Sequence, residues 1–221
     1  MWGLRILPGN TVSMKHEWKK AEKQFYLPEN KPRLVEIPSF RFFTIEGKGN
    51  PNDDFFAEYI GVLYSLSYAV KMSQKKGLAP TGYFDYAVYP LEGVWDLNVE
   101  ARKVYKGSFD KNDLIFKLMI RQPDFVDHSF AMQILELTQK NKPNKLLQKV
   151  KFEEIGEGEC IQMLHTGSYD NEPETFAQME QFAEQLTLKR ADKTHREIYL
   201  SDARKVSADR LKTVLRFCVE K

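Results

Sequence analysis

The spacing of apolar residues predicts an alternation of strands and helices along the chain. Apolar side chains at every second residue indicate strands, and apolar side chains three or four residues apart indicate helices. The longest predicted helix begins at Asn52 or Asp53, buries a stripe that includes Leu63 and Leu66, and ends at Gly77. The other predicted helices cover 17–25, 124–140 and 173–186, and the predicted strands cover 41–46, 84–89 with a continuation at 94–95, 114–121, 160–166, 196–201 and 213–219. Elements in this order predict an α+β fold.

The order strand, helix, strand, strand occurs twice, and the two copies keep register. A shift of 120 positions places Gly167 on Gly47 and Phe176 on Phe56. In both copies the strand ends at the glycine, and the helix begins through the phenylalanine. This internal duplication predicts βαββ halves related by a pseudo-two-fold axis, as two sheets with their helices outside, and a ligand cleft where the halves meet.

The same pattern sets the expected boundaries. Residues 1–13 show no amphipathic period, and the second methionine, Met14, begins a highly charged run. We therefore expect 1–13 to be an N-terminal extension that is not native to the protein. Residues 14–33 are expected to form a helix and its lead-in, and 34–221 one ligand-binding domain. The predicted halves of this domain are 34–123 and 145–221, joined by the helix 124–141.

Composition excludes several classes of protein. A net charge of +2, with no basic run longer than three residues, argues against a nucleic-acid partner. No apolar stretch reaches 18 residues, so we expect no membrane span. Cys160 and Cys218 are the two cysteines, and both are interpreted as small buried hydrophobes in a reducing compartment. The expected location is therefore the cytoplasm.

One predicted strand carries an isolated acid. Strand alternation puts Ile198 and Leu200 on one face and His195, Glu197 and Tyr199 on the other. If the two aliphatic side chains pack against the helices, Glu197 points toward the cleft, where a carboxylate needs partners or a raised pKa. The alternative, which periodicity alone favours, is that this face is solvated and Glu197 is an ordinary strand charge.

Aromatic residues are numerous, with 15 Phe and 10 Tyr in the chain. Tyr and Trp combine a flat apolar face with a hydrogen-bonding edge, which suits planar or cationic ligands. Trp95 is the strongest candidate, because it follows a Pro/Gly interruption that re-aims a side chain. Core packing is the alternative interpretation for each aromatic. The candidate ligand-binding residues are Tyr86, Tyr89, Trp95, His165, Tyr169 and Tyr199.

Other chemistries find no support in the sequence. Neither CxxC nor HExxH spacing is present, so we expect no metal site and no cofactor. Gly47–Gly49 is too short for a phosphate loop, and Ser168 lacks triad partners. His165 alternates into a strand and is interpreted as a structural histidine rather than a base, although it lies beside the expected cleft.

Four segments, taken together, resemble the GyrI-like small-molecule-binding proteins. They are 90–95 (PLEGVW), 119–126 (MIRQPDFV), 165–173 (HTGSYDNEP) and 197–202 (EIYLSD). The resemblance covers about residues 30–219 and is to the stand-alone branch, without a DNA-binding domain. It implies a duplicated βαββ fold with a ligand cleft between the halves.

The resemblance also implies a role for Glu197. Effector domains of this family use a buried acid at the cleft to recognise hydrophobic cations, and Glu197 matches that position. One subfamily hydrolyses the cyclopropane of cyclopropanoid DNA-alkylating agents within an aromatic cage, which would make Glu197 the base that activates water. Val94–Trp95–Asp96 departs from that subfamily where a second aromatic residue is expected. The residues available for a cage are Tyr89, Trp95, Tyr169 and Tyr199.

Three functions follow as hypotheses. The first is a hydrolase that detoxifies planar hydrophobic xenobiotics, and the second is a protein that binds such molecules without turnover. These two differ only in whether product forms. The third is an inhibitor of a protein partner, which the gyrase-inhibitor branch of the family implies, but the sequence shows no patch for it. We therefore expect a planar hydrophobic small molecule as the partner, and no protein, nucleic acid or membrane.

Overall fold

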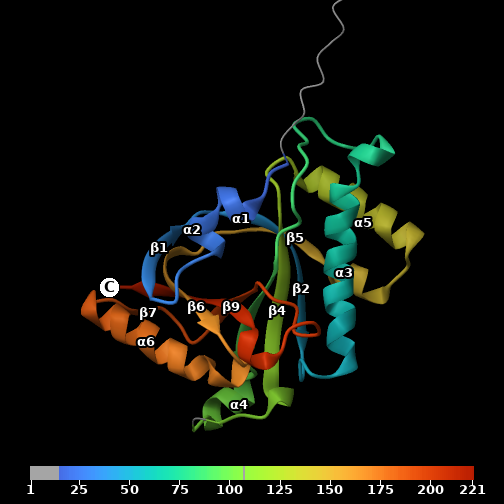
Figure 1. The fold of residues 1–221 in the computed structure, drawn as a ribbon. Helices are drawn as coiled ribbons and strands as arrows, with labels where there is room; N and C mark the ends of the chain where they lie inside the picture. Colours follow the sequence, from blue (N-terminus) through green and yellow to red (C-terminus); the bar gives the residue numbers. More distant parts are fainter. Residues whose placement is uncertain (1–14, 107) are drawn as a thin grey trace, which may run out of the picture.

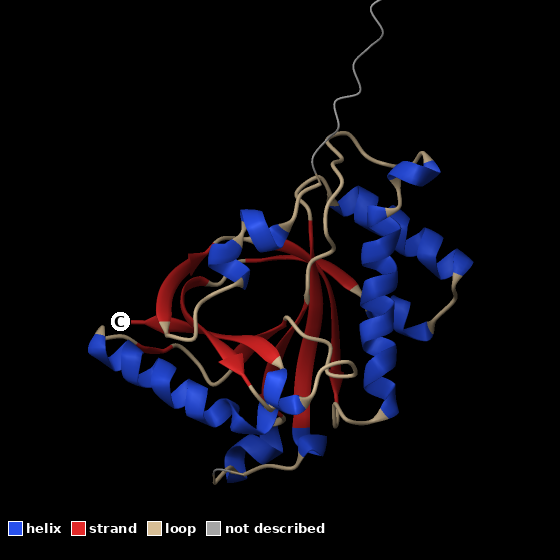
Figure 2. Ribbon diagram, viewed as in Figure 1, coloured by secondary structure: helices blue, strands red, loops and turns tan. Residues whose placement is uncertain are grey.

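The computed structural model describes residues 15–106 and 108–221, and shows one curled antiparallel sheet flanked by helices (Figures 1 and 2). The sheet bends into a half-barrel, which confirms the α+β class. The boundary expected between residues 13 and 14 lies outside the described residues.

The strands pair in the order β1-β6-β9-β8-β3-β4-β2-β5, and β7 pairs with β9. Their bounds are β1 Arg33–Ile37, β2 Phe40–Lys48, β3 Leu91–Leu97, β4 Leu114–Gln122, β5 Lys151–Ile155, β6 Gly158–Thr166, β7 Lys189–Arg190, β8 His195–Tyr199 and β9 Lys212–Glu220. The α-helices are α1 Trp18–Ala21, α2 Lys23–Tyr26, α3 Asp54–Lys71, α4 Val99–Val104, α5 His128–Asn141 and α6 Glu172–Gln185.

The edge strands β1 and β5 each pair with a strand of the other predicted half, β1 with β6 and β5 with β2. At the centre of the sheet the two predicted halves meet at the pairing of β3 with β8. Trp95 lies opposite His195 in this pair, and Gly93 lies opposite Glu197. The expectation of two separate sheets is therefore wrong, because β3 and β8 join the halves into one sheet. On either side of this pair the order is β3-β4-β2 and β8-β9-β6, so the strands of each half stand in corresponding places. The duplication itself stays a prediction.

One face of the sheet carries the long helices. Helix α3 buries Leu63, Leu66 and Val70 against β2 and β4, as its apolar stripe predicts. Helix α6 buries Met179 and Ala183 against β6. Figure 1 shows the two helices over opposite halves of the sheet, so the β3–β8 junction lies between them.

The N-terminal segment is attached through Glu22. Residues 17–25 were expected to form one helix, but they form the short helices α1 and α2, separated at Glu22. Here the backbone leaves the helical region, and the carboxylate bonds to Arg121, to the Tyr89 hydroxyl at 2.6 Å and to His16 at 2.8 Å. These contacts explain the break, because a buried carboxylate needs several partners.

A buried ion-pair network holds the centre of the sheet. Arg196 on β8 donates to Glu92 on β3 at 2.7 Å and to Glu157 at 2.8 Å. Arg216 on β9 donates to the other oxygen of Glu157 at 2.9 Å. Because Arg196 and Glu197 are neighbours on a strand, they point to opposite faces. The network therefore fixes the strand from the face that Glu197 does not use.

Several predicted element bounds differ from the structure. The strand expected over 84–89 is wrong, since this segment makes a single bridge, between His16 and Tyr86, and β3 begins only after Pro90. Helix α5 begins at His128 rather than at 124, because the Asp127 side chain accepts from the Phe130 amide at 2.8 Å. Strands β1 and β5 lie at the sheet edges, where partly exposed faces gave no apolar signal.

Within residues 15–106 and 108–221, no helix combines the length and the apolar character needed to cross a bilayer.

Candidate functional site

Glu197 lies on the face of the sheet that carries α3 and α6. Directly opposed residues of neighbouring strands share a face, and the register aligns Leu118, Gly93, Glu197, Leu215 and Met163 in one row. Leu118 belongs to the core with α3, and Leu215 and Met163 pack with α6. Pleating therefore turns Ile198 to the opposite face, which reverses the packing expected for it.

Glu197 is buried, with 8% of the residue exposed, and its carboxylate has polar neighbours. His195 Nε2 lies 3.0 Å from Glu197 Oε1. The indole Nε1 of Trp95 donates to the Tyr199 oxygen at 2.8 Å, and the charge of Glu197 is one of the causes that raise the pKa of the Tyr199 hydroxyl. His195 and the Trp95–Tyr199 pair are therefore the polar neighbours of the Glu197 carboxylate.

A second carboxylate lies beside the first. Glu172 sits in the first turn of α6, and 7% of the residue is exposed. One of its oxygens lies within 4.8 Å of a ring nitrogen of His195 and of a carboxylate oxygen of Glu197. Its buried Oε1 has no hydrogen-bond partner in the described part of the chain. The junction of the halves thus holds two carboxylates, of which Glu197 has a polar partner in His195 and Glu172 keeps an unpaired oxygen.

The environment raises the pKa of Glu172 to about 10. Burial is the largest cause, followed by the negative charges of Glu197 and Asp170. The positive end of α6 favours the ionised form, but this effect is smaller than the desolvation of a buried charge. At neutral pH Glu172 therefore holds a proton.

Aromatic rings surround the two acids. Burial and the charge of Glu197 raise the pKa of Tyr169 to about 12 and that of Tyr199 well above its usual value, so both hydroxyls remain protonated donors. The ring centroids of Phe56 on α3 and Trp95 are 5.8 Å apart, and those of Phe176 on α6 and His195 are 4.8 Å apart. The acid–aromatic cluster is defined here as Trp95, Tyr169, Glu172, His195, Glu197 and Tyr199.

Tyr169 marks the side from which the cluster can be reached. It is 37% exposed, and its ring packs edge-on against Tyr199 at 6.1 Å. Two grooves of the described surface lie elsewhere, one along Trp18, Tyr68 and Val88 and another along Val62 and Pro143. These two grooves lack paired acids, so the chemistry favours the cluster.

Three candidate residues lie outside the cluster. The His165 ring bonds to Thr175 Oγ1 at 2.8 Å and to the Ser168 carbonyl at 3.0 Å, so both nitrogens have partners. Tyr86 is buried and donates to the Ser67 carbonyl at 3.4 Å, while Tyr89 is buried against Glu22. The structure brings Trp95, Tyr169 and Tyr199 to Glu197. His165, Tyr86 and Tyr89 instead contact other residues. A role for them in ligand binding stays a prediction.

Glu172 and His195 were not among the candidates from the sequence. Glu172 precedes Pro173 at the start of a helix, where an acid is ordinary because it interacts with the helix dipole. The available signal was its place in the 165–173 motif, four residues before Phe176, which is the residue that aligns with Phe56. His195 was assigned to the face of Glu197 but was given no role.

Two groups of described residues bring donor atoms close enough for a metal ion. One is Glu172, His195 and Glu197, where Glu172 holds a proton at neutral pH. The other is Glu157, Cys160 and Cys218, where Arg196 and Arg216 bind the carboxylate. The expectation that the protein has no metal site stays a prediction.

Gly93 provides a direct test of the packing in the cluster. A Cβ added there would lie 2.8 Å from Trp95 Nε1 and 3.2 Å from the Tyr199 oxygen. We expect Gly93→Ala to displace both side chains, to destabilise the fold by about 1–3 kcal/mol and to weaken ligand binding. Urea unfolding and ligand titration measure the two effects. Gly61→Ala is the control, because that Cβ meets nothing within 4 Å and should stabilise α3 by up to about 1 kcal/mol.

The fold and much of the sequence are shared with proteins of known structure. A hydrolase from Listeria innocua is 34% identical, over 93% of this chain and 100% of its own length, with a TM-score of 0.84. A second hydrolase from this organism is 36% identical over the same shares of both chains, with a TM-score of 0.83. No curated protein matches the chain. The GyrI-like small molecule binding domain matches residues 30–219, nearly the whole described chain. With that match and these relatives, the chain belongs to the GyrI-like family of small-molecule-binding domains.

Proposed function

We propose that the protein binds flat, largely apolar molecules at the acid–aromatic cluster and hydrolyses the cyclopropane of cyclopropanoid DNA-alkylating agents. The observation that carries the proposal is the pair of neighbouring buried carboxylates among Trp and Tyr side chains, of which Glu172 has a raised pKa. Two neighbouring carboxylates in unlike environments can divide the roles of acid and base in proton transfer at neutral pH. The Listeria relatives described as hydrolases support a reaction of this class.

The reaction needs little beyond positioning and proton transfer. Glu197 takes a proton from a water molecule, whose oxygen attacks the unsubstituted cyclopropane carbon. The strained C–C bond breaks, and its electron pair moves through the dienone to the carbonyl oxygen. The six-membered ring becomes aromatic, and this oxygen becomes the phenolate oxygen attached to it. Glu172 supplies a proton to that oxygen. The product is the substrate plus one water.

The two carboxylates then return to their starting state. Glu197 has gained a proton and Glu172 has lost one, and their oxygens lie within 4.8 Å of each other, a distance that one water bridges. Transfer of the proton from Glu197 to Glu172 restores the pair without a further residue. Tyr199 and Tyr169 remain neutral donors throughout, because their raised pKa values prevent ionisation near neutral pH.

A second candidate is binding without turnover. Glu197 has a low exposure and would serve equally as the counter-ion of a bound organic cation. Mass spectrometry of a cyclopropanoid incubated with the full chain separates the two functions. If the protein is a hydrolase, many molecules of a product heavier by one water form per protein molecule. If the substrate binds stoichiometrically and is recovered unchanged, the protein binds such molecules without turnover.

The charge preference of the site follows from its acids. The hydrogen-bond partner of Glu197 in the described structure is His195, and no Lys or Arg of the described residues pairs with this carboxylate. We therefore expect a planar cationic dye to bind at least about tenfold more tightly than an anionic dye of similar shape. Trp95→Ala should weaken both dyes, because stacking is indifferent to charge. Dye fluorescence titration measures this, and tighter binding of the anion would contradict it.

A further inference from the structure

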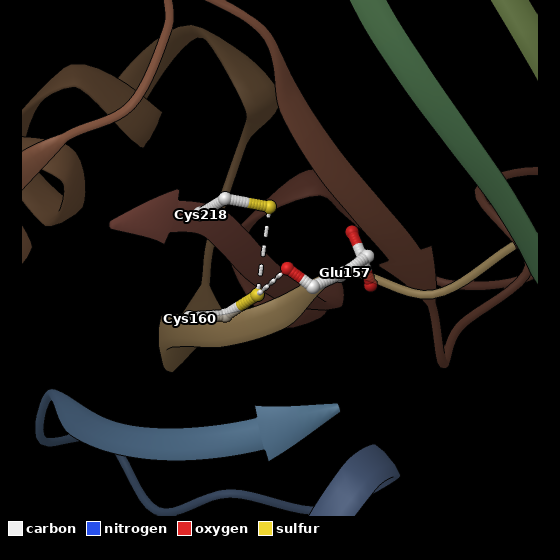
Figure 3. Close-up of side chains that lie close together, drawn as sticks. All are labelled: Glu157, Cys160 and Cys218. Atoms are coloured by element: carbon white, nitrogen blue, oxygen red, sulfur yellow. Dashed lines mark hydrogen bonds between the residues drawn. The ribbon is translucent and has the colours of Figure 1, made fainter. Parts of the chain in front are cut away.

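The two cysteines of the chain lie side by side on neighbouring strands. Cys160 on β6 and Cys218 on β9 are directly opposed in the antiparallel ladder, although they are 58 positions apart in the chain. Their sulfur atoms lie 3.6 Å apart, with the Cys160 thiol donating to Cys218 (Figure 3). Opposed residues of an antiparallel pair have Cα atoms about 4.5–5.5 Å apart, within the range that a disulfide spans.

The two thiols differ in exposure and in ionisation. Cys160 is fully buried, whereas Cys218 is partly exposed. The hydrogen bond from Cys160 lowers the pKa of the Cys218 thiol, and the same bond with burial raises that of Cys160. Cys218 is thus the thiol that a soluble oxidant can reach, and Cys160 lies behind it as a second thiol.

A metal ion is a poorer occupant of this place. Glu157 is the remaining metal-ligand candidate of the group, and its backbone carbonyl oxygen lies 3.9 Å from the Cys160 sulfur (Figure 3). Its two carboxylate oxygens are held by Arg196 at 2.8 Å and by Arg216 at 2.9 Å. A metal cation would have to approach two buried guanidinium groups and displace them from their counter-ion.

We propose that Cys160 and Cys218 are a site of reversible oxidation, at which a peroxide converts the two thiols into a disulfide that joins β6 to β9. The separation of the sulfurs, their cross-strand register and the exposure of one thiol carry this inference. It is independent of the ligand and of the chemistry at Glu197.

The reaction proceeds in two steps. The Cys218 thiol gives up its proton, the thiolate attacks one oxygen of hydrogen peroxide, and the O–O bond breaks, so that Cys218 becomes a sulfenic acid and the departing hydroxide takes up that proton to leave as water. The Cys160 sulfur then attacks the Cys218 sulfur, the S–O bond breaks, and a second water leaves with the Cys160 proton. Two thiols and one peroxide give one disulfide and two waters. A dithiol reductant reverses the change.

The experiment treats the folded full-length chain with hydrogen peroxide, blocks free thiols with iodoacetamide, and maps the peptides without reduction. We expect a peptide pair joined through Cys160 and Cys218, formed in the monomer and lost after dithiothreitol. The oxidised protein should melt about 5 °C or more above the reduced protein, because the bond closes a long loop. Cys160→Ser/Cys218→Ser should show no shift with peroxide.

The single variants keep the test decisive. Cys160→Ser should stop at a sulfenic acid on Cys218, and Cys218→Ser should leave Cys160 unmodified because that thiol is buried. The proposal is overturned if both thiols of the folded parent remain free, if Cys218 is oxidised further while Cys160 stays a thiol, or if the bond forms between two chains. A fall in melting temperature on oxidation would contradict the stabilising role.

Discussion

Replacing Glu197 with Gln is expected to lower turnover of a cyclopropanoid by roughly 10²–10⁴-fold, the usual contribution of a positioned general base. Glutamine keeps the shape of the side chain and an oxygen that can accept a hydrogen bond, but it cannot take a proton from water. Binding of a neutral substrate should change little, because its stacking contacts remain. Single-turnover mass spectrometry and ligand titration measure the two quantities separately.

Glu159→Gln is the matched control for this variant. Glu159 is an exposed glutamate of strand β6, so the change removes a strand carboxylate without touching the cluster, and activity should stay at the level of the parent. If Glu197→Gln turns over a neutral cyclopropanoid as fast as the parent, Glu197 is not the base. Weaker binding of organic cations with unchanged turnover would identify it as a counter-ion only.

The sequence was sufficient for the parts of the site that lie on one strand. Alternation along β8 grouped His195, Glu197 and Tyr199 on one face, and the structure has them on one face. It was not sufficient to say which side of the sheet that face looks toward. That depends on the row of opposed residues from Leu118 to Met163, which exists only once β3 has paired with β8.

Long-range pairing also explains the aromatic residues. Trp95 reaches Tyr199 because β3 lies beside β8, and no local pattern encodes a contact between residues 104 positions apart. Tyr86 and Tyr89 had the same composition signal as Trp95, yet Pro90 separates them from the strand, and they pack with other partners. Residue type therefore identified the candidate ligand-binding aromatics, while the pairing of β3 with β8 determined that Trp95, and not Tyr86 or Tyr89, lies beside Tyr199.

The pKa of Glu172 makes the stability of the protein depend on pH in a defined direction. The folded-state pKa is about 10, whereas a glutamate in the unfolded chain has its ordinary value of 4.5. Below pH 4.5 both states hold the proton, and the full stability is present. As pH rises toward 10, the unfolded state gives up a proton that the folded state retains, so this contribution to stability is progressively lost.

Glu172→Gln should therefore stabilise the protein at alkaline pH. Glutamine cannot ionise, so the free energy of unfolding of the variant should exceed that of the parent by on the order of 2–4 kcal/mol at pH 8. The difference should shrink toward zero near pH 4.5. Urea unfolding at several pH values measures it. Glu174→Gln is the control, because Glu174 lies in the same first helical turn but is exposed.

The same variant should lose activity while it gains stability. Without an ionisable group at position 172, the proton needed at the new phenol oxygen must come from solvent, and turnover should fall by roughly 10²-fold, the lower range for a positioned acid. A residue with a purely structural role would change both quantities in the same direction. A variant that is equally active, or that is less stable than the parent at pH 8, would show that Glu172 does not hold the proton that the reaction uses. Glu197→Gln offers a further check on the pair: it removes the charge that raises the pKa of Glu172, so the loss of stability between pH 4.5 and 10 should become smaller in that variant.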